Sequence, residues 1–400
     1  MTALNLDSYP LVYRGSVKNL YQVKEAKGDT PGIYLFQFTD DYSIFDYGKM
    51  PDTLEGKGAA LTLMAANIFE RLEDPSEWQS LATSPVWGKI EDTDVRRRLL
   101  DSSTLSRLKK DGFKTHYRGV RDASGRLVKT SDLREPTTLM EVASVRIIRP
   151  QRLMENGNLR WDYSAIFRGL KNYLVPLENI FRFGLPKGSS LLERFAKNPD
   201  YAKTLGLKKP AAEGSWLPRP VMEFSTKLEP GDRYMMPEEA QRISGLEGQE
   251  FQDLQELTFL VALFLMHLFS KVGVELWDGK VEFLKTDRLV MGDSVTPDEL
   301  RLLKNGVQIS KEPLRQYYKK FQPDFVEKIM KSKKIAGQTN RAIAQVLRED
   351  FGCQPERLQG DFKKTFTSMY VALSQEITGL KLFPHCPSLD AVIGQLKDLS

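Results

Sequence analysis

The sequence predicts an α+β protein in which antiparallel sheets pack against helices and a helical extension follows. Three observations support this fold class. Short runs of alternating apolar and polar residues recur between residues 11 and 301, and several are paired across tight turns, which is typical of β-hairpins. The stretch from about Gln249 to Lys271 has an apolar face at helical spacing and predicts a buried helix. Residues 319–400 are amphipathic and strongly charged, which indicates further helices.

The composition limits the classes of function. The chain has 400 residues, enough for two or three sub-domains with their own cores. A formal charge of +5 at pH 7 is small for this length, so it fits an anionic small-molecule ligand and does not require nucleic acid. The longest apolar run, Leu257–Phe269, is too short to span a bilayer, and we expect no membrane partner.

The cysteines and the N-terminus indicate a cytoplasmic protein. Cys353 and Cys386 are far apart and lack metal-ligand spacing, as in the reduced proteins of the cytosol. The first residues lack a basic region followed by an apolar segment, so we expect no signal peptide.

The first chemical pattern is a hairpin near the N-terminus. Leu11–Val23 alternates around a glycine, which predicts two strands joined by a tight turn at Gly15 and Ser16, with Lys18 just beyond it. Backbone N–H groups and a lysine in such a turn can bind phosphate, although most such turns are plain hairpins. Ile33–Phe38 predicts the next strand.

A loop, a helix and a possible hinge follow. The polar, acidic and glycine-bearing stretch 39–58 predicts a loop, and Ala59–Glu73 continues with helical spacing. Loops after strands often carry binding residues. Phe113–Arg118 predicts a short strand whose His116 is expected to be structural. Met140–Pro150 predicts a β-rich run that ends in proline and could join two lobes.

A second pattern suits phosphate. Val175–Arg182 predicts a strand that ends in an arginine, and Gly188–Ser190 opens a helix soon after. An arginine beside a helix N-terminus that carries hydroxyl groups is a good phosphate site. A loop arginine with an N-cap serine explains the same residues equally well. Further on, Lys227 and Asp232 lie on a predicted loop between a strand and a helix.

The strongest chemical pattern lies between Trp277 and Arg301. Asp278, Lys280 and Glu282 fall at spacing two, so a strand points all three side chains to one face. The apolar residues that alternate with them would then face the core.

The same segment predicts a β-hairpin with a turn at 285–288. In that register Lys280 lies opposite Asp293, and Glu282 is diagonal to Asp293. Two carboxylates about 4 Å apart repel by roughly 4 kcal/mol at an effective dielectric constant near 20, a cost that a divalent cation removes. Two hard oxygen ligands, with other positions left to water and phosphate, suit Mg²⁺. A solvated hairpin explains the strand alone equally well, but Arg301 adds an anion-binding group and favours the metal.

Several motifs together resemble one family. The stretch Asp278–Phe283 resembles the D-x-K-x-E-F signature of the phosphoribosylaminoimidazole-succinocarboxamide synthase (SAICAR synthetase) family, and residues 292–301 continue that pattern in register. Val175–Arg182 resembles the family's P-L-E-x-I-x-R signature. The other similar segments are Tyr13–Lys18, Ser43–Asp46, Glu55–Gly58, Thr115–Tyr117 and Ser225–Lys227.

The resemblance implies a fold and a division into lobes. It covers roughly residues 11–318 and implies a two-lobed SAICAR synthase-like fold related to ATP-grasp. We expect an N-terminal ATP-binding lobe over residues 1–148 and a substrate and metal lobe over 149–318. The helical extension over 319–400 lies outside the resemblance, and its role stays open.

The chain also departs from the family pattern. Insertions fall near 81–110 and 150–172. Ser16 stands where the phosphate loop of the family has a lysine, which removes one charge from the expected ATP site. Glu299 and Leu300 stand where the family has small polar residues. These departures leave the expected metal ligands intact.

The family's reaction defines the expected ligands. Its members join the carboxylate of carboxyaminoimidazole ribonucleotide (CAIR) to the amine of L-aspartate and convert ATP to ADP and phosphate. ATP phosphorylates the carboxylate because oxide cannot leave, so the protein has to position the reactants and stabilise charge. The resemblance therefore implies ATP, Mg²⁺, CAIR and L-aspartate as ligands.

The resemblance also gives each motif residue a role. Glu282 and Asp293 are expected to hold the metal. The residues expected to bind ATP are Gly15, Ser16, Lys18 and Lys227. The residues expected to bind the other substrates are Ser43, Asp46, Arg182, Ser189, Asp232 and Arg301. The residues expected to act on the reacting groups are Lys280, Asp278 and Asp298.

Two alternatives of other classes remain at this stage. One is an ATP-dependent small-molecule kinase or another ligase on the same fold, which would need no aspartate site. The other is a non-catalytic relative that binds nucleotide and uses its helical tail for interaction. Ser16 favours the second alternative, whereas Lys280, Glu282 and Asp293 argue against it.

Overall fold

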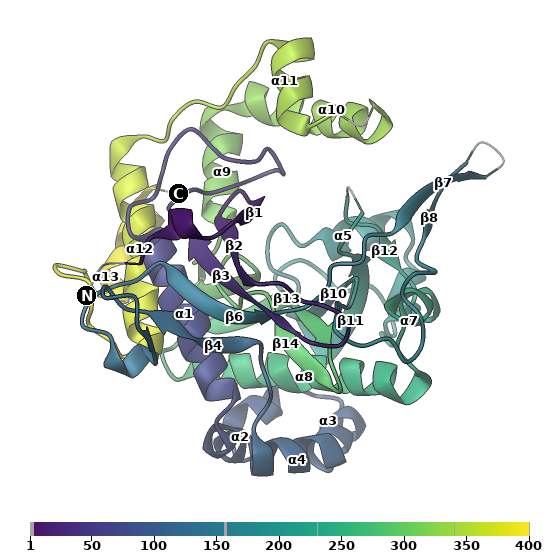
Figure 1. Ribbon diagram of the computed structural model, residues 1–400. Coiled ribbons are helices and arrows are strands. Elements are labelled where there is room, and N and C mark those ends of the chain that lie inside the picture. The colour runs from purple at the N-terminus through teal and green to yellow at the C-terminus, as the bar shows by residue number, and fades with distance from the viewer. Residues whose placement is uncertain (1–3, 156–157, 230, 340, 400) are drawn as a thin grey trace.

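The computed structural model describes residues 4–155, 158–229, 231–339 and 341–399. Within them the chain forms two antiparallel sheets with helices packed against both, as Figure 1 shows. One continuous apolar core runs through both sheets and their helices. The predicted α+β class, with antiparallel sheets and packed helices, is therefore confirmed.

The N-terminal sheet has the strand order β1-β2-β3-β6-β4-β5. Its strands are β1 (Leu11–Arg14), β2 (Lys18–Lys24), β3 (Gly32–Phe38), β4 (Tyr117–Arg121), β5 (Leu127–Val128) and β6 (Leu139–Ser144). Helix α1 (Lys57–Leu72) lies against β3, β4 and β6. The β1–β2 turn requires glycine, because a Cβ at Gly15 would lie 2.5 Å from the carbonyl oxygen of Lys18.

The second sheet has the order β12-β11-β10-β13-β15-β16, and β9 and β14 pair with β13. Its strands are β9 (Tyr173–Leu174), β10 (Leu177–Gly184), β11 (Trp216–Thr226), β12 (Tyr234–Met235), β13 (Glu275–Lys285), β14 (Leu289–Gly292), β15 (Leu300–Lys304) and β16 (Val307–Gln308). Strand β13 is the centre of this sheet because it pairs with β9, β10, β14 and β15.

Helix α8 (Gly248–Ser270) is the core helix of the second sheet. By length and composition it could cross a membrane, but most of its residues are buried inside the protein. It packs against β10 and β13 and against α2 (Pro75–Ala82) and α4 (Ser103–Asp111). His267 on α8 contacts the hydroxyl oxygens of Ser80 and Ser84 at 3.1 and 2.7 Å, which ties α8 to α2 and to the segment that follows it.

The predicted insertions form separate substructures. The 81–110 segment is mostly helical, and α3 (Thr93–Leu100) joins α2 and α4 below α8 (Figure 1). Strands β7 (Gln151–Glu155) and β8 (Asn158–Asp162) form a hairpin that projects from the body of the molecule (Figure 1). The other helices of the second half are α5 (Ser190–Lys197), α6 (Tyr201–Thr204) and α7 (Pro237–Ser244).

The predicted register of the central hairpin is wrong by one residue. Lys285 pairs with Leu289, and Glu282 pairs with Gly292, so the turn has three residues instead of four. Lys285 joins the ladder because its ammonium group is bound by Glu250 at the start of α8. Asp293 consequently lies beyond the end of β14, in a left-handed conformation with φ 59°, and not opposite Lys280.

The predicted strand at Phe113–Arg118 begins later, at Tyr117. The reason is that the preceding residues contact the second sheet: His116 N donates to the carbonyl oxygen of Met291 at 2.9 Å, and Met291 N donates to Lys114 O at 3.1 Å. This short connection brings the N-terminal sheet beside β14.

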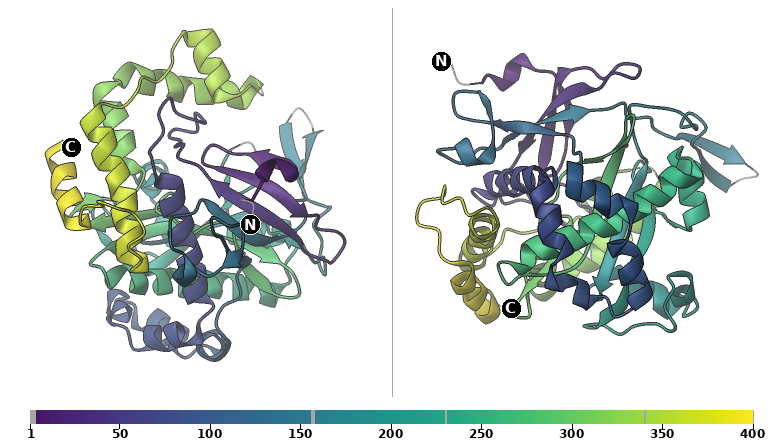
Figure 2. Two further views of the ribbon diagram at one scale, coloured as in Figure 1. Left: turned by 60° about the vertical axis from the view of Figure 1, so that its left-hand side comes forward. Right: turned by 90° about the horizontal axis from the view of Figure 1, so that it is seen from below.

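The C-terminal tail is part of the same core. It contains α9 (Glu312–Phe321), α10 (Pro323–Thr339), α11 (Ile343–Phe351), α12 (Gly360–Thr378) and α13 (Leu389–Leu399). Helix α12 lies along α1, and α13 lies along α12 (Figure 2). Phe366, Met369 and Leu373 on α12 are fully buried. The tail therefore covers α1 on the side away from the N-terminal sheet.

We expect Leu373→Ala to destabilise the whole protein by about 2–5 kcal/mol, because it removes a fully buried side chain from α12, which packs against α1 and α13. Urea unfolding followed by far-UV circular dichroism measures the change. Lys364→Ala, an exposed position on the same helix, is the control. If Leu373→Ala changed only a minor early transition, the tail would be a separate folding unit.

Candidate active site

Two cavities adjoin each other where the sheets meet. The first, of about 440 Å³, lies between the N-terminal sheet and the β13–β14 hairpin. The second, of about 370 Å³, lies over β10, β13 and the start of α9. Ser16 and Glu299 line both cavities, so these two residues mark the junction.

The first cavity has apolar walls and a charged floor. Its apolar lining comes from both sheets and includes Phe36, Val142, Val145, Leu174, Leu228 and Leu284. Its polar lining includes all the residues predicted to bind ATP or metal, namely Gly15, Ser16, Lys18, Lys227, Glu282 and Asp293. The structure therefore brings these predicted residues together in one place.

Three carboxylates and three lysines form the floor where the cavities adjoin. Lys227 Nζ lies 2.6 Å from Glu282 Oε1, and the Lys18 ammonium group is ion-paired with Asp293. Glu178 on β10 receives Lys280 Nζ at 2.6 Å and lies 3.6 Å from Lys227 Nζ. We call these residues the acid–lysine cluster: Glu178, Glu282, Asp293, Lys18, Lys227 and Lys280. Each charge has a partner, which is what burial of so many charges requires.

The two acids predicted to hold metal differ in electrostatic environment. Burial, together with the charge of Asp293, raises the pKa of Glu282 to about 7, although Lys227 acts in the opposite direction. Burial would also raise the pKa of Asp293, but Lys18 and Lys227 hold it below its usual range. A divalent cation at this place would supply the positive charge that favours ionised Glu282.

His116 supports the position of Asp293. Its Nε2 lies 2.9 Å from the Asp293 carbonyl oxygen, and its ring is packed edge-on against Phe36 and Phe69. Burial lowers the pKa of His116 to about 4, so the ring is neutral at pH 7. A neutral imidazole can donate Nε2–H to that carbonyl group and fix the left-handed backbone of Asp293.

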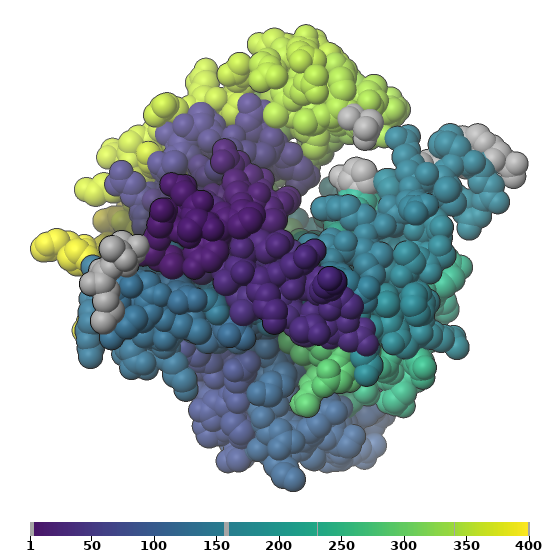
Figure 3. Space-filling model, in the orientation of Figure 1, coloured from purple at the N-terminus to yellow at the C-terminus, as the bar shows by residue number. Residues whose placement is uncertain are grey.

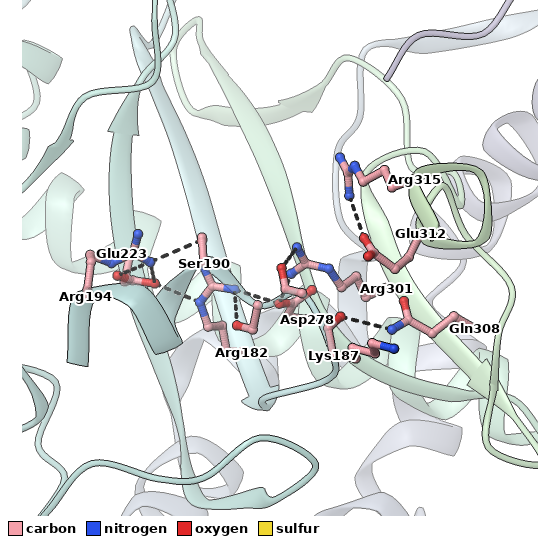
Figure 4. A network of polar contacts seen from close by, with 12 residues as sticks. Arg182, Lys187, Ser190, Arg194, Glu223, Asp278, Arg301, Gln308, Glu312 and Arg315 are labelled. Carbon is pink, nitrogen blue, oxygen red and sulfur yellow. Dashed lines mark hydrogen bonds and ion pairs between the residues drawn. The ribbon is translucent and has the colours of Figure 1, made fainter. Parts of the chain in front are cut away.

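Arginines dominate one end of the second cavity. Arg182 Nη1 lies 2.6 Å from Asp278 Oδ2, and Arg301 Nη1 lies 2.7 Å from the same oxygen. Figure 4 shows the two guanidinium groups approaching Asp278 from opposite sides. Arg182 also donates from Nε to Glu223 at 2.7 Å, and Glu223 pairs with Arg194. Asp278 thus holds two arginines at the edge of one cavity.

Ser189, predicted to bind substrate, and its neighbour Ser190 differ in their position. Arg182 reaches both Ser189 Oγ and Ser190 Oγ at 3.4 Å. Ser190 lines the second cavity, whereas Ser189 is buried at the N-cap of α5 and is absent from that lining.

The remaining residues predicted for substrates or chemistry all line this cavity: Ser43, Asp46, Arg182, Asp232, Asp278, Lys280, Asp298 and Arg301.

Asp298 is held by groups that the sequence pattern does not predict. Its carboxylate lies 3.0 Å from Lys57 Nζ and 3.4 Å from Lys311 Nζ, and it accepts a hydrogen bond from the Tyr370 hydroxyl at 2.8 Å. Burial would raise the pKa of Asp298, but Lys311 and Lys57 lower it. Tyr370 belongs to tail helix α12, so the tail contributes a side chain directly behind the cavity.

The tail also holds the loop that carries Ser43 and Asp46. Phe45 and Asp46 both have left-handed backbones, with φ 53° and 57°, a conformation that costs about 1–3 kcal/mol per residue. Helix α10 stabilises this loop: Lys333 Nζ lies 2.6 Å from Asp46 Oδ2, and the Phe325 ring packs 6.4 Å from that of Phe45. In the space-filling view the yellow-green tail helices stand above a recess in the surface (Figure 3).

Sequence reasoning missed several of these residues. Glu178 lies inside the P-L-E motif and could have been found there, because an acid within a buried strand needs a partner. Lys311 and Tyr370 carried no local signal, since their partner Asp298 is distant in sequence.

Glu282 and Asp293 fit a magnesium ion by their chemistry. Both side chains are hard oxygen donors that line the first cavity. A larger group, of three or more acidic, histidine or cysteine side chains that could hold a metal, does not occur in the described part of the chain. Two protein carboxylates, with water and phosphate completing the shell, is the arrangement that Mg²⁺ favours.

A family comparison and a curated relative both point to the SAICAR synthetase family. Residues 11–130 and 150–333 match the SAICAR synthetase family. The chain is 37% identical over 389 residues to a protein of Archaeoglobus fulgidus named "Putative phosphoribosylaminoimidazole-succinocarboxamide synthase", covering 96% of this chain and 99% of that protein.

Two solved structures show the same fold. The SAICAR-synthase of Saccharomyces cerevisiae complexed with SAICAR has a TM-score of 0.54 at 21% identity and covers 96% of this chain and 99% of its own. A structure named SAICAR synthase has a TM-score of 0.53 at 20% identity and covers 96% of this chain and all of its own. Both alignments extend over most of the tail, which the sequence motifs did not reach.

We expect Arg182→Ala to destabilise the protein by about 3–5 kcal/mol, because a fully buried guanidinium group bonded to two buried acids is lost. Arg301→Ala should cost less, because Arg301 is partly exposed and Asp278 keeps Arg182. Urea unfolding of the two variants gives the comparison. Equal losses in the free energy of unfolding would show that the two arginines contribute equally to stability, contrary to this expectation.

Proposed function

We infer that this chain, which belongs to the SAICAR synthetase family, catalyses the ATP-dependent ligation of L-aspartate to carboxyaminoimidazole ribonucleotide, giving SAICAR, ADP and phosphate in purine biosynthesis. The observation that carries this function is the family match over most of the chain, with a relative similar along nearly its whole length. The expected family and fold are thereby confirmed. The kinase and non-catalytic alternatives lack such support.

We propose that ATP occupies the first cavity. Its apolar walls suit a purine base, and Lys18 and Lys227, with the backbone at Gly15 and Ser16, suit the phosphates. We assign Mg²⁺ to Glu282 and Asp293. An ion held by these two carboxylates would supply positive charge next to the phosphates. The lysines that now pair with these acids would then be available to the phosphates.

We propose that the ribonucleotide occupies the second cavity. Arg182 and Arg301 converge there and would bind its 5′-phosphate, with a serine hydroxyl from the start of α5. Ser190 fits this contact better than Ser189, because Ser190 faces the cavity. Asp278 holds both arginines, and Asp298 would accept hydrogen bonds from the ring amine or the ribose.

The chemistry would take place where the cavities adjoin. The carboxylate of the ribonucleotide attacks the γ-phosphorus, an oxygen–phosphorus bond forms, and ADP leaves. The amine of aspartate then attacks the carbonyl carbon, a carbon–nitrogen bond forms, and phosphate leaves with the electron pair of the carbon–oxygen bond. Of the two protons that the ammonium loses, one ends on phosphate and one on water. Lys280 would offset charge on the carboxylate or the phosphoryl group.

Further proposals concern the lobes, the loop and the location. We propose that residues 1–148 and 149–318 act as ATP and substrate lobes, and that the loop from Ser43 to Lys57 closes over the substrates. The tail after residue 318 would support that loop through α10.

A cytoplasmic location is supported by the two unpaired cysteines.

A coupled assay of ADP release tests the function. The purified protein is given ATP, Mg²⁺, CAIR and L-aspartate, and each is then omitted in turn. We expect sustained release of ADP only with all four present, together with formation of SAICAR. ADP release that continues without aspartate would indicate a kinase, and no release under any condition would indicate a non-catalytic relative.

Glu282→Gln should lower kcat by at least about 100-fold, because the amide keeps the size of the side chain but loses the anionic metal ligand. Steady-state kinetics at saturating substrates measures the loss, with circular dichroism to show that the variant folds. Glu275→Gln, an exposed acid on the same strand, is the control and should retain full activity. Wild-type turnover in Glu282→Gln would remove this residue from the metal site.

Arg301→Ala should raise the KM for CAIR about tenfold or more while the KM values for ATP and aspartate change little, because one of two phosphate-binding guanidinium groups is lost. Initial rates with each substrate varied in turn give the three constants. Arg288→Ala, in the exposed β13–β14 turn, serves as the matched control. An unchanged KM for CAIR would place its phosphate elsewhere.

A further inference from the structure

The acidic side chains that line the second cavity differ in the number of ion pairs they form. Asp278 has two arginines, Glu178 has two lysines, Asp298 has two lysines, and Asp46 has Lys333. Among the residues that the structure describes, Asp232 and Glu299 are the two acids of this cavity without an ion pair.

Glu299 is held rigidly in its place. Its N–H donates to the Thr296 carbonyl oxygen at 3.0 Å, and its own carbonyl oxygen accepts from Lys280 N at 3.2 Å. The Thr296 hydroxyl donates to one carboxylate oxygen. The nearby cation Lys311 is engaged with Asp298. The carboxylate of Glu299 therefore keeps hydrogen-bonding capacity that no cation of the described protein uses.

Glu299 lies where the two cavities meet. Glu299 lines both cavities, whereas Asp232 lines only the second. In the proposed function, the γ-phosphate comes from the first cavity and the carboxylate from the second, so the activated carbon lies near their junction. The nitrogen nucleophile has to reach that same carbon.

We propose that Glu299 binds the ammonium group of the amino-acid substrate and holds its nitrogen at the junction of the two cavities. This inference rests on the proposed function and deepens it by naming a residue for aspartate. Among ATP, CAIR and aspartate, only aspartate carries a positive charge at neutral pH. A carboxylate without a cation is the complementary group, since hydrogen bonds between charged partners are the strong ones.

The surrounding charges agree with a site that receives a cation. Burial and the neighbouring carboxylates of Asp298 and Asp293 raise the pKa of Glu299, while Lys311 and the Thr296 hydroxyl act in the opposite direction. An ammonium group at this place would relieve the repulsion between these acids. A neutral or anionic ligand group would not.

The test compares L-aspartate with succinate, which has the same two carboxylates and no ammonium group. Glu299→Gln should raise the KM for aspartate about 10- to 100-fold, as expected for loss of a hydrogen bond between charged groups. The inhibition constant of succinate and the KM values for ATP and CAIR should change less than about threefold. Glu299→Asp, which keeps the charge, should recover part of the affinity for aspartate.

Matched variants separate the possible outcomes. Asp94→Asn, an exposed acid on α3 remote from both cavities, should leave every constant unchanged. The inference is overturned if Glu299→Gln weakens succinate as much as aspartate, or if it mainly raises the KM for ATP. It is also overturned if Asp232→Asn, and not Glu299→Gln, abolishes the preference for aspartate over succinate.

The outcomes also distinguish this inference from the function on which it rests. Wild-type protein that releases ADP without aspartate would overturn the proposed function and the inference with it. Wild-type protein that needs all substrates, combined with an unchanged KM for aspartate in both Glu299 variants, would overturn the inference alone.

Discussion

Charge compensation in the acid–lysine cluster is the constraint on which the rest of the structure depends. Its six residues come from β2, β10, the loop after β11, β13 and the residue after β14. An unpaired charge at such a buried place is costly, so each residue needs its partner from another element. Lys18 and Asp293 in particular join the N-terminal sheet to the second sheet. The cluster therefore specifies how the two sheets meet and where the cavities form.

In the proposed function, the same cluster would also prepare the site for a highly charged substrate. Lys18 and Lys227 balance the acids now, and they are the groups that suit a triphosphate. In the proposed function, a metal ion would be a new partner for the acids and the phosphates would be new partners for the lysines. Little rearrangement is then needed, which is the basis of electrostatic preorganisation.

The tail extends this arrangement beyond the two sheets. Tyr370 bonds Asp298 from behind the second cavity, and Lys333 and Phe325 hold the loop that carries Phe45 and Asp46. The strained backbone of that loop persists because these contacts compensate for it. In the proposed function, this segment without a motif would thus shape the substrate side of the site. The Archaeoglobus fulgidus relative matches 96% of this chain, so its similarity extends over most of the tail.

The sequence by itself determined the local features of this protein. Alternation at spacing two placed Asp278, Lys280 and Glu282 on one face, and the motifs indicated the family, because both depend on neighbouring residues. Tertiary structure alone decided the hairpin register, in which Lys285 is drawn into the ladder by Glu250. It also decided which charges meet: the two arginines on Asp278, and Glu299 at the cavity junction without a cation. Such pairings depend on long-range packing, which no local pattern encodes.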